Sequence, residues 1–76
     1  SSASNKDEEI LDLQILPNEL IVTSKEKFKV TVYDLTGMII LKSEESHIDL
    51  PTLKKGTYIC NVYTNYKCVK KKFMVN

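Results

Sequence analysis

The sequence predicts an all-β protein, an immunoglobulin-like Greek-key β-sandwich of six to seven short strands. Three observations support this fold class. Short segments in which apolar and polar residues alternate with a period of two recur along the 76-residue chain. Turn-forming residues, among them both prolines and both glycines, separate these segments. No segment carries apolar residues at helical spacing over more than about two turns.

The first residues differ from the rest in composition. Residues 1–9 contain serine, asparagine, lysine and acidic residues with a single alanine. Such a segment buries too little apolar surface to offset the entropy lost on ordering, so we expect a flexible lead-in. One sandwich domain is expected over residues 10–76, near the smallest size that folds without a disulfide or a metal ion. A domain of this size leaves no room for a large substrate cavity.

The first two strands are separated by a proline-asparagine turn. Apolar residues alternate with aspartate and glutamine over residues 10–16, which predicts a half-buried strand. Pro17 lacks the amide hydrogen that a strand needs, and Asn18 favours a turn. Residues 19–23 are then expected to form the second strand.

A hairpin is predicted around the first glycine. Residues 27–33 alternate regularly, which places Phe28, Val30 and Val32 on one face. The sequence Asp-Leu-Thr-Gly follows, in which Asp34 can accept hydrogen bonds from the turn backbone. Gly37 can adopt positive φ, as a type I turn followed by a bulge requires. This turn leads into a strand at residues 38–42.

The second half of the chain repeats the pattern. Residues 47–50 are expected to form a short strand, and Leu53 to pack beneath the turn that follows it. Gly56 is expected to supply a second position with positive φ before the strand at residues 57–63. A last strand is expected at residues 68–75.

The last strand carries three consecutive lysines. Val69, Phe73 and Val75 share one face, and Lys71 interrupts it. A lysine can cover apolar surface with its stem while its amine reaches water, so we expect this strand at the edge of a sheet.

The charge balance excludes some partners. Eleven lysines and arginines oppose ten acidic residues, and the net charge of +1 gives no field strong enough to attract nucleic acid or an anionic membrane. The acidic residues gather at residues 7–12 and the lysines at residues 67–72, which we interpret as a local feature of the two ends. The longest apolar run, residues 38–41, is far shorter than the roughly 20 residues of a membrane-spanning helix.

Neither cysteine indicates a disulfide or a metal site. Cys60 alternates in phase with the inward-facing residues of its strand, whereas Cys68 is out of phase with the apolar face of the next strand. Bridged cysteines need Cα atoms within about 7 Å and converging side chains, so we predict free thiols. With His47 as the only histidine, the cysteines lack the spacing of a zinc site. We expect no metal and no other cofactor.

Catalysis is not expected either. His47 has no acidic partner or nucleophile at the spacing of a known motif, and we interpret it as a solvated residue. The adjacent acidic pairs Glu8-Glu9 and Glu44-Glu45 lie in polar segments, where they add solubility rather than general acid and base groups. The lysines near Tyr63 and Tyr66 could bind single-stranded nucleic acid, but lysines also protect an edge strand from aggregation, and the strip is short. We therefore do not expect nucleic acid as a partner.

The motifs around the two glycines resemble those of the C-terminal sorting domain of proteins exported by the type IX secretion system of Bacteroidota. That family combines a Tyr-Asp-x-x-Gly turn, an Ile-Asp-Leu-x-x-Leu-x-x-Gly-x-Tyr segment and a basic last strand. The matching residues are Tyr33, Asp34, Gly37, Ile48, Asp49, Leu50, Leu53, Gly56, Tyr58, Val62 and Lys71.

The resemblance implies an exported protein, found in the periplasm, on the cell surface or in the medium. It also implies a non-catalytic module that the secretion machinery recognises by protein contact. The candidate recognition strand carries Lys70, Lys71 and Lys72, within a C-terminal hairpin at residues 57–76. Because a sorting domain is the tail of a larger cargo protein, a second hypothesis stays open: a stand-alone secreted or periplasmic immunoglobulin-like protein that binds a ligand or mediates adhesion.

Overall fold

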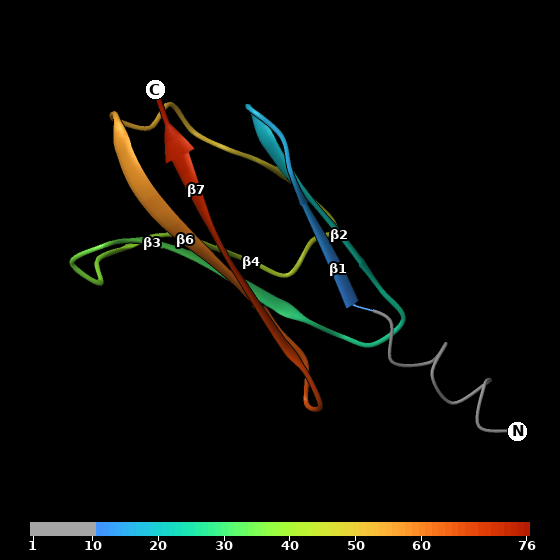
Figure 1. The fold of residues 1–76 in the computed structure, drawn as a ribbon. Coiled ribbons are helices and arrows are strands. Elements are labelled where there is room, and N and C mark those ends of the chain that lie inside the picture. The colour runs from blue at the N-terminus through green and yellow to red at the C-terminus, as the bar shows by residue number, and fades with distance from the viewer. Residues whose placement is uncertain (1–10) are drawn as a thin grey trace, which may run out of the picture.

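The computed structural model describes residues 11–76, so the expected lead-in at residues 1–9 lies outside the described residues. These residues form seven antiparallel strands in two sheets that face each other (Figure 1). The strands are β1 (Leu11–Ile15), β2 (Glu19–Ser24), β3 (Lys29–Asp34), β4 (Ile39–Ser43), β5 (His47–Asp49), β6 (Gly56–Tyr63) and β7 (Cys68–Val75).

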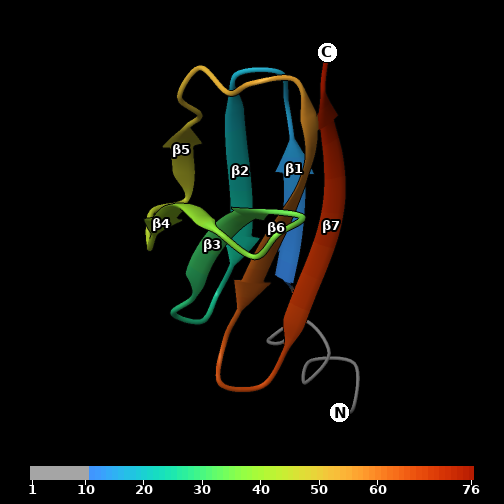
Figure 2. The same cartoon turned by 90° about the vertical axis from the view of Figure 1, so that its left-hand side faces the viewer.

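The order of the strands is that of an immunoglobulin-like sandwich. One sheet has the order β1-β2-β5 and the other the order β4-β3-β6-β7. Three connections cross from one sheet to the other, from β2 to β3, from β4 to β5 and from β5 to β6. This arrangement confirms the predicted fold class. In Figure 2, β7 lies beside β1, so the outer edges of the two sheets meet on that side.

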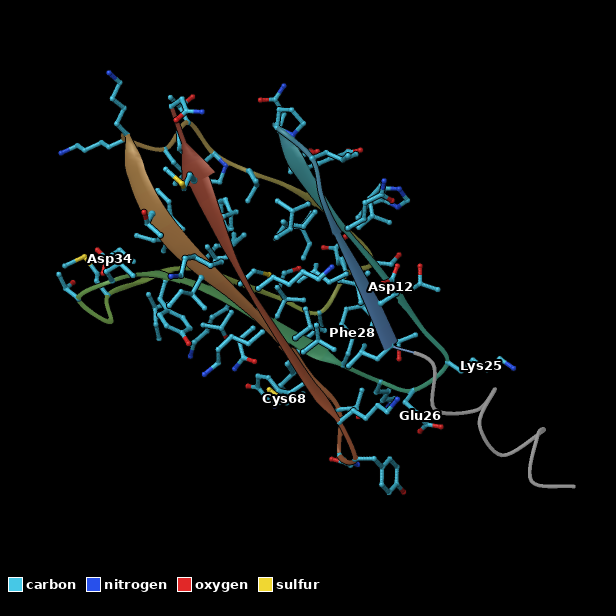
Figure 3. All side chains as sticks on the ribbon, viewed as in Figure 1. Asp12, Lys25, Glu26, Phe28, Asp34 and Cys68 are labelled. Atoms are coloured by element: carbon cyan, nitrogen blue, oxygen red, sulfur yellow. The ribbon has the colours of Figure 1, made fainter. Side chains whose placement is uncertain are left out.

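Alternation in the sequence decides which side chains enter the core. In β2, β3 and β6 alternate residues are buried between the sheets, and in β1 Leu13 is buried with Leu11 and Ile15 half-buried on the same face. The buried residues are Leu13, Leu20, Val22, Val30, Val32, Ile48, Tyr58, Cys60 and Val62. Phe28 and Leu53 are half-buried against this core, as expected, and Figure 3 shows Phe28 between the two layers. Strand pairing places Leu13 opposite Val22, and Val32 opposite Cys60.

Tyr58 fixes the connection between β5 and β6. Its ring is buried and stacks on Phe73 of β7, with 5.7 Å between the ring centroids. Its hydroxyl donates a 2.7 Å hydrogen bond to the carbonyl oxygen of Lys54, four residues earlier. A tyrosine that bonds back to the preceding loop in this way is the tyrosine corner of immunoglobulin-like sandwiches. The contact anchors the loop that carries Leu53 to the core.

Removing the Tyr58 hydroxyl should therefore destabilise the sandwich without emptying its core. We expect Tyr58→Phe to lower the free energy of unfolding by about 0.5–1.5 kcal/mol, since the Lys54 carbonyl loses its partner while the ring stays in place. Urea denaturation followed by circular dichroism measures the change. Tyr66→Phe is the matched control, because Tyr66 is 76% exposed. Equal stability of the two variants would contradict this role.

Candidate recognition surface

The turn between β3 and β4 is organised by the Asp34 carboxylate. Its Oδ1 atom accepts hydrogen bonds from the Thr36 amide (2.9 Å), the Thr36 hydroxyl (2.6 Å) and the Met38 amide (3.0 Å). The Thr36 hydroxyl, followed by backbone amides of the turn, lowers the pKa of Asp34 below its ordinary value. The Gly37 amide donates to the Asp34 carbonyl oxygen at 3.0 Å, and Gly37 has φ of +92°. These are the features of a type I turn followed by a bulge.

The same hairpin contains a shift in strand register that changes where one side chain points. Val32 pairs with Leu41 and Tyr33 pairs with Ile39, so Ile40 is an extra residue in β4. Simple alternation would place Ile39 on the same face as Leu41, toward the core. The bulge instead turns Ile39 to the outer face beside Tyr33, where it is 51% exposed. Alternation alone gives no sign of this reversal.

Gly56 begins β6 with φ of +150° and is exposed. No atom lies within 4 Å of the position that a Cβ atom would take at Gly56 or at Gly37. The two glycines are therefore required by backbone conformation and not by close packing. Both lie at turns, away from the lysines of β7.

The three candidate recognition lysines do not point the same way. In β7, which is an edge strand as expected, Lys70 pairs with Asn61 and Lys72 pairs with Ile59, so both face outward from the sheet. Lys71 pairs with the buried Cys60 and faces the other sheet. Only two of the three lysines are thus available on the outer face.

Lys71 joins the two sheets. Its Nζ atom donates a 2.9 Å hydrogen bond to the carbonyl oxygen of Leu13 in β1, across the side where the sheet edges meet. Pairing with Cys60 directs the stem of Lys71 toward the other sheet, and its amine ends on backbone, whereas the sequence predicts that it reaches water. Because β1 is an edge strand, this carbonyl would otherwise lack a protein partner on that side.

Both cysteines are free, as predicted, and lie on opposite faces of the four-stranded sheet. Burial raises the pKa of the Cys60 thiol to about 11, so this thiol stays protonated and unreactive at neutral pH. Cys68 is exposed, and its Sγ atom donates a 2.8 Å hydrogen bond to Oδ1 of Asn61. The opposite directions explain the absence of a bridge between them.

Strand pairing gathers lysines from three strands on the outer face of the four-stranded sheet. One row across the sheet consists of Lys42, Thr31, Asn61 and Lys70. The next row consists of Ile39, Tyr33, Ile59 and Lys72. Beyond the first row lie Lys29, Tyr63 and Cys68, and beyond the second lie Thr57 and Met74. We call this surface the lysine face.

The opposite face of the sandwich has the opposite charge. The outward positions of β1, β2 and β5 carry Asp12, Glu19 and Asp49, with no lysine. Figure 3 shows Asp12 and Cys68 on opposite sides of the two layers. The net charge is only +1, although the two faces of the sandwich carry charges of opposite sign. Charge is sorted between faces as well as along the chain, which composition did not reveal.

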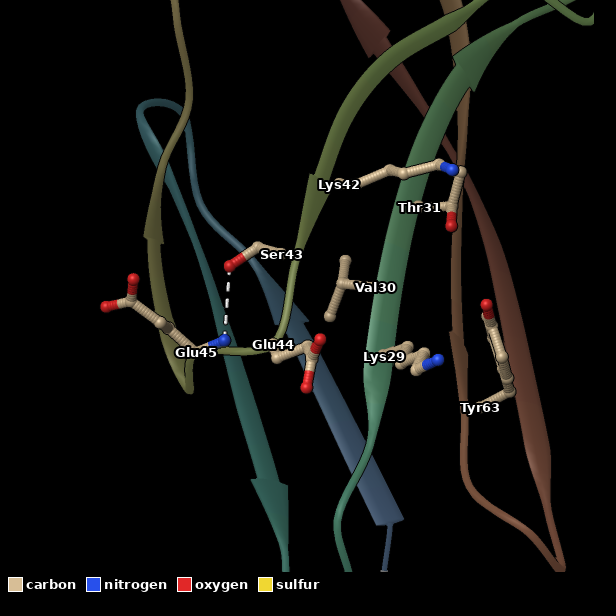
Figure 4. A pocket seen from close by; sticks show the side chains of 8 residues that line it. All are labelled: Lys29, Val30, Thr31, Lys42, Ser43, Glu44, Glu45 and Tyr63. Atoms are coloured by element: carbon tan, nitrogen blue, oxygen red, sulfur yellow. Dashed lines mark hydrogen bonds between the residues drawn. The ribbon is translucent and has the colours of Figure 1, made fainter.

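A shallow hollow lies at one corner of the lysine face (Figure 4). It encloses about 450 Å³ and is bordered by Lys29, Lys42 and Tyr63 together with Glu44 and Glu45, which follow β4. The Glu45 amide donates to the Ser43 hydroxyl at 3.1 Å, which holds this corner. With both signs of charge on its rim, the hollow is no pocket selective for an anion.

Several features of metal centres and buried polar sites are absent from the described residues. Among residues 11–76, no three histidine, cysteine or acidic side chains gather where they could hold a metal ion. His47 is exposed on β5. Within the same part of the chain, no polar or charged side chain is buried. The exposed side chains of the lysine face include ammonium groups and apolar groups.

Comparison with known proteins identifies the family. The family described as the secretion system C-terminal sorting domain matches residues 16–76, which include six of the seven strands in full. The chain belongs to this family. Such a domain is a non-catalytic module that marks proteins for export by type IX secretion, to the periplasm, the cell surface or the medium.

Other comparisons add nothing to this assignment. No curated protein and no solved structure matches this chain. No helix among residues 11–76 has the length and apolar character needed to cross a membrane.

The Asp34 turn of the sorting domain should give a pH-dependent contribution to stability. Since the folded pKa lies below the unfolded one, this contribution is present above the unfolded pKa of about 3.9 and is lost as pH falls through the folded pKa. We expect Asp34→Asn to be less stable than the wild type at pH 7, and the difference to shrink below about pH 4. Thermal denaturation of both proteins measures this difference in stability. The pH is varied from about 2 to about 7, roughly the range over which carboxylates titrate. A difference that stays constant over this range would contradict the assignment.

Lys71 should matter more for stability than its neighbour. We expect Lys71→Ala to lower the free energy of unfolding by about 1–2 kcal/mol, because the Leu13 carbonyl loses its donor and the core loses the covering stem. Lys70→Ala, on the outer face, should change it by less than about 0.5 kcal/mol. Lys71→Met keeps the stem but removes the donor, so its loss of unfolding free energy should lie between those of the two alanine variants. Urea denaturation compares the three, and equal stability of the two alanine variants would exclude the bridging role.

Proposed function

We propose that the C-terminal hairpin of this sorting domain, residues 57–76, is the part that a protein of the secretion machinery contacts. Lys70 and Lys72 supply charge to the contact, and Lys71 holds the strand against β1. The proposed role is recognition without catalysis. The single observation that carries this proposal is the family match, which assigns a sorting role to a chain whose last strand is a basic sheet edge.

The geometry of the hairpin supports this role. β6 and β7 pair over their full length, from Gly56 opposite Val75 to Tyr63 opposite Cys68. Thr64 closes the loop, because its Oγ1 atom accepts hydrogen bonds from the amides of Tyr66 (3.0 Å) and Lys67 (2.9 Å). A rigid hairpin loses little entropy on binding, so it can present two lysines at a fixed spacing. On one face of a strand, Lys70 and Lys72 are about 6.6 Å apart along the backbone.

Export of a reporter protein tests the proposal. The chain is fused to the C-terminus of a reporter that carries a leader peptide, and the fusion is produced in a bacterium with a type IX secretion system. We expect the reporter outside the cell, and we expect Lys70→Glu/Lys72→Glu to reduce its export by about tenfold or more because rim charges govern encounter with a partner.

The matched control is Lys25→Glu/Lys54→Glu, which makes the same change in net charge in two exposed loops. This control should be exported like the wild type. A wild-type fusion that remains in the periplasm would refute the sorting role and favour a stand-alone binding or adhesion protein. Equal losses in both double variants would show an effect of total charge and refute recognition by the hairpin.

A further inference from the structure

The lysine face extends well beyond the hairpin. Lys29 in β3 and Lys42 in β4 lie outside residues 57–76, yet the sheet order brings them to the same surface as Lys70 and Lys72. The outward positions of these four strands carry no carboxylate, since Asp34 pairs with Tyr58, whose ring is buried on the inner side. Four positive charges from separate parts of the sequence thus share one face, with Glu44 and Glu45 at the corner beside Lys29 and Lys42.

Apolar side chains lie beside these charges on the same face. Ile39 is 51% exposed, Met74 is 69% exposed and Tyr63 is 38% exposed. Ile39 reaches this face because of the bulge in β4, and bulges that re-aim a side chain are common beside functional sites. Exposed apolar groups ringed by charge are typical of a surface that contacts another protein.

We propose that the whole lysine face docks onto an acidic protein surface that presents apolar side chains between its carboxylates. This inference rests on the proposed sorting function and identifies the chemistry of the partner. Charge complementarity determines the sign: the partner must be negative where Lys29, Lys42, Lys70 and Lys72 approach it. Ile39 and Met74 then meet apolar groups and lose their contact with water.

The size of the face predicts a transient contact. The face has thirteen outward positions, each covering about 4.8 Å by 6.6 Å, which gives roughly 400 Å². Stable complexes bury about 800 Å² on each partner, so this area corresponds to a weak, short-lived encounter. Such an encounter is suited to a signal that must be released after transport.

Three other occupants fit the face less well. A second copy would bring its acidic face, where Ile21 is the single apolar residue among the outward positions of β1, β2 and β5, so Ile39 and Met74 would remain unpaired. Anionic lipid or nucleic acid needs a denser array of positive charge than four lysines spread over three rows of the sheet. An acidic protein surface can match both the charges and the apolar groups.

The decisive variant is Lys29→Glu/Lys42→Glu, which leaves the hairpin unchanged. If the whole face docks, export of the reporter fusion should fall about as much as with Lys70→Glu/Lys72→Glu, tenfold or more. Each variant must first show the melting transition of the wild type, which excludes misfolding. Lys25→Glu/Lys54→Glu again provides the matched change in charge, with unchanged export.

The outcomes separate this inference from the proposed function. Loss of export with the Lys70 and Lys72 variant alone would overturn docking by the whole face and leave recognition by the hairpin intact. If the wild type is exported and neither double variant reduces export, both the docking inference and the proposed recognition by the hairpin are overturned. If export is lost with both double variants and not with the control variant, the inference is supported.

Photo-crosslinking identifies the class of the occupant. A photoreactive amino acid replaces Ile39 or Met74 in the reporter fusion, with His47 on the opposite face as the control position. We expect a protein adduct from the first two positions only, at a partner site rich in aspartate or glutamate. Adducts with lipid, nucleic acid or a second copy of the chain would each overturn the inference, as would no adduct during normal export.

Discussion

The two sheets are held together by one apolar layer, to which β1, β2, β3, β5 and β6 each contribute buried side chains. Burying each leucine, isoleucine or valine side chain contributes about 1.5–3 kcal/mol relative to leaving it exposed. A shift of any strand by one residue would move its buried set into water, so this layer fixes the register of the strands. Fixing the inner positions also fixes the outer ones. The direction of every lysine on the strands follows from the packing of the core.

The layer is incomplete at the side where β1 and β7 meet, and Lys71 completes it. The side chain at this position faces inward, where apolar groups are favoured. It also lies beside the free edge of β1, whose carbonyl groups need hydrogen-bond donors. A lysine serves both needs, because its stem lies on apolar residues and its amine bonds to the Leu13 carbonyl. The edge of β7 is thereby held in place. The two neighbouring lysines remain free for contact outside the sandwich.

In the proposed docking, the small area of the lysine face suits a brief contact with a partner. The basic and acidic faces of this sandwich lie on opposite sides, so its orientation relative to a charged partner is defined before contact. The Asp34 turn holds the end of β3 and β4 from which Ile39 emerges. Stability, orientation and contact thus depend on different residues of one small sheet.

The sequence by itself determined the strands, the turns and the phase of each side chain, because alternation and turn chemistry act over a few neighbouring residues. From that phase followed the burial of Cys60, the exposure of Cys68 and their free thiols. Only the tertiary structure decided the rest. Lys29, Lys42 and Lys70 meet on one face because β3, β4 and β7 share a sheet, and Lys71 finds Leu13 because two sheet edges adjoin. Pairing between distant strands depends on the shared core and leaves no local mark in the sequence, and the bulge that exposes Ile39 reverses a phase that alternation alone assigns to the interior.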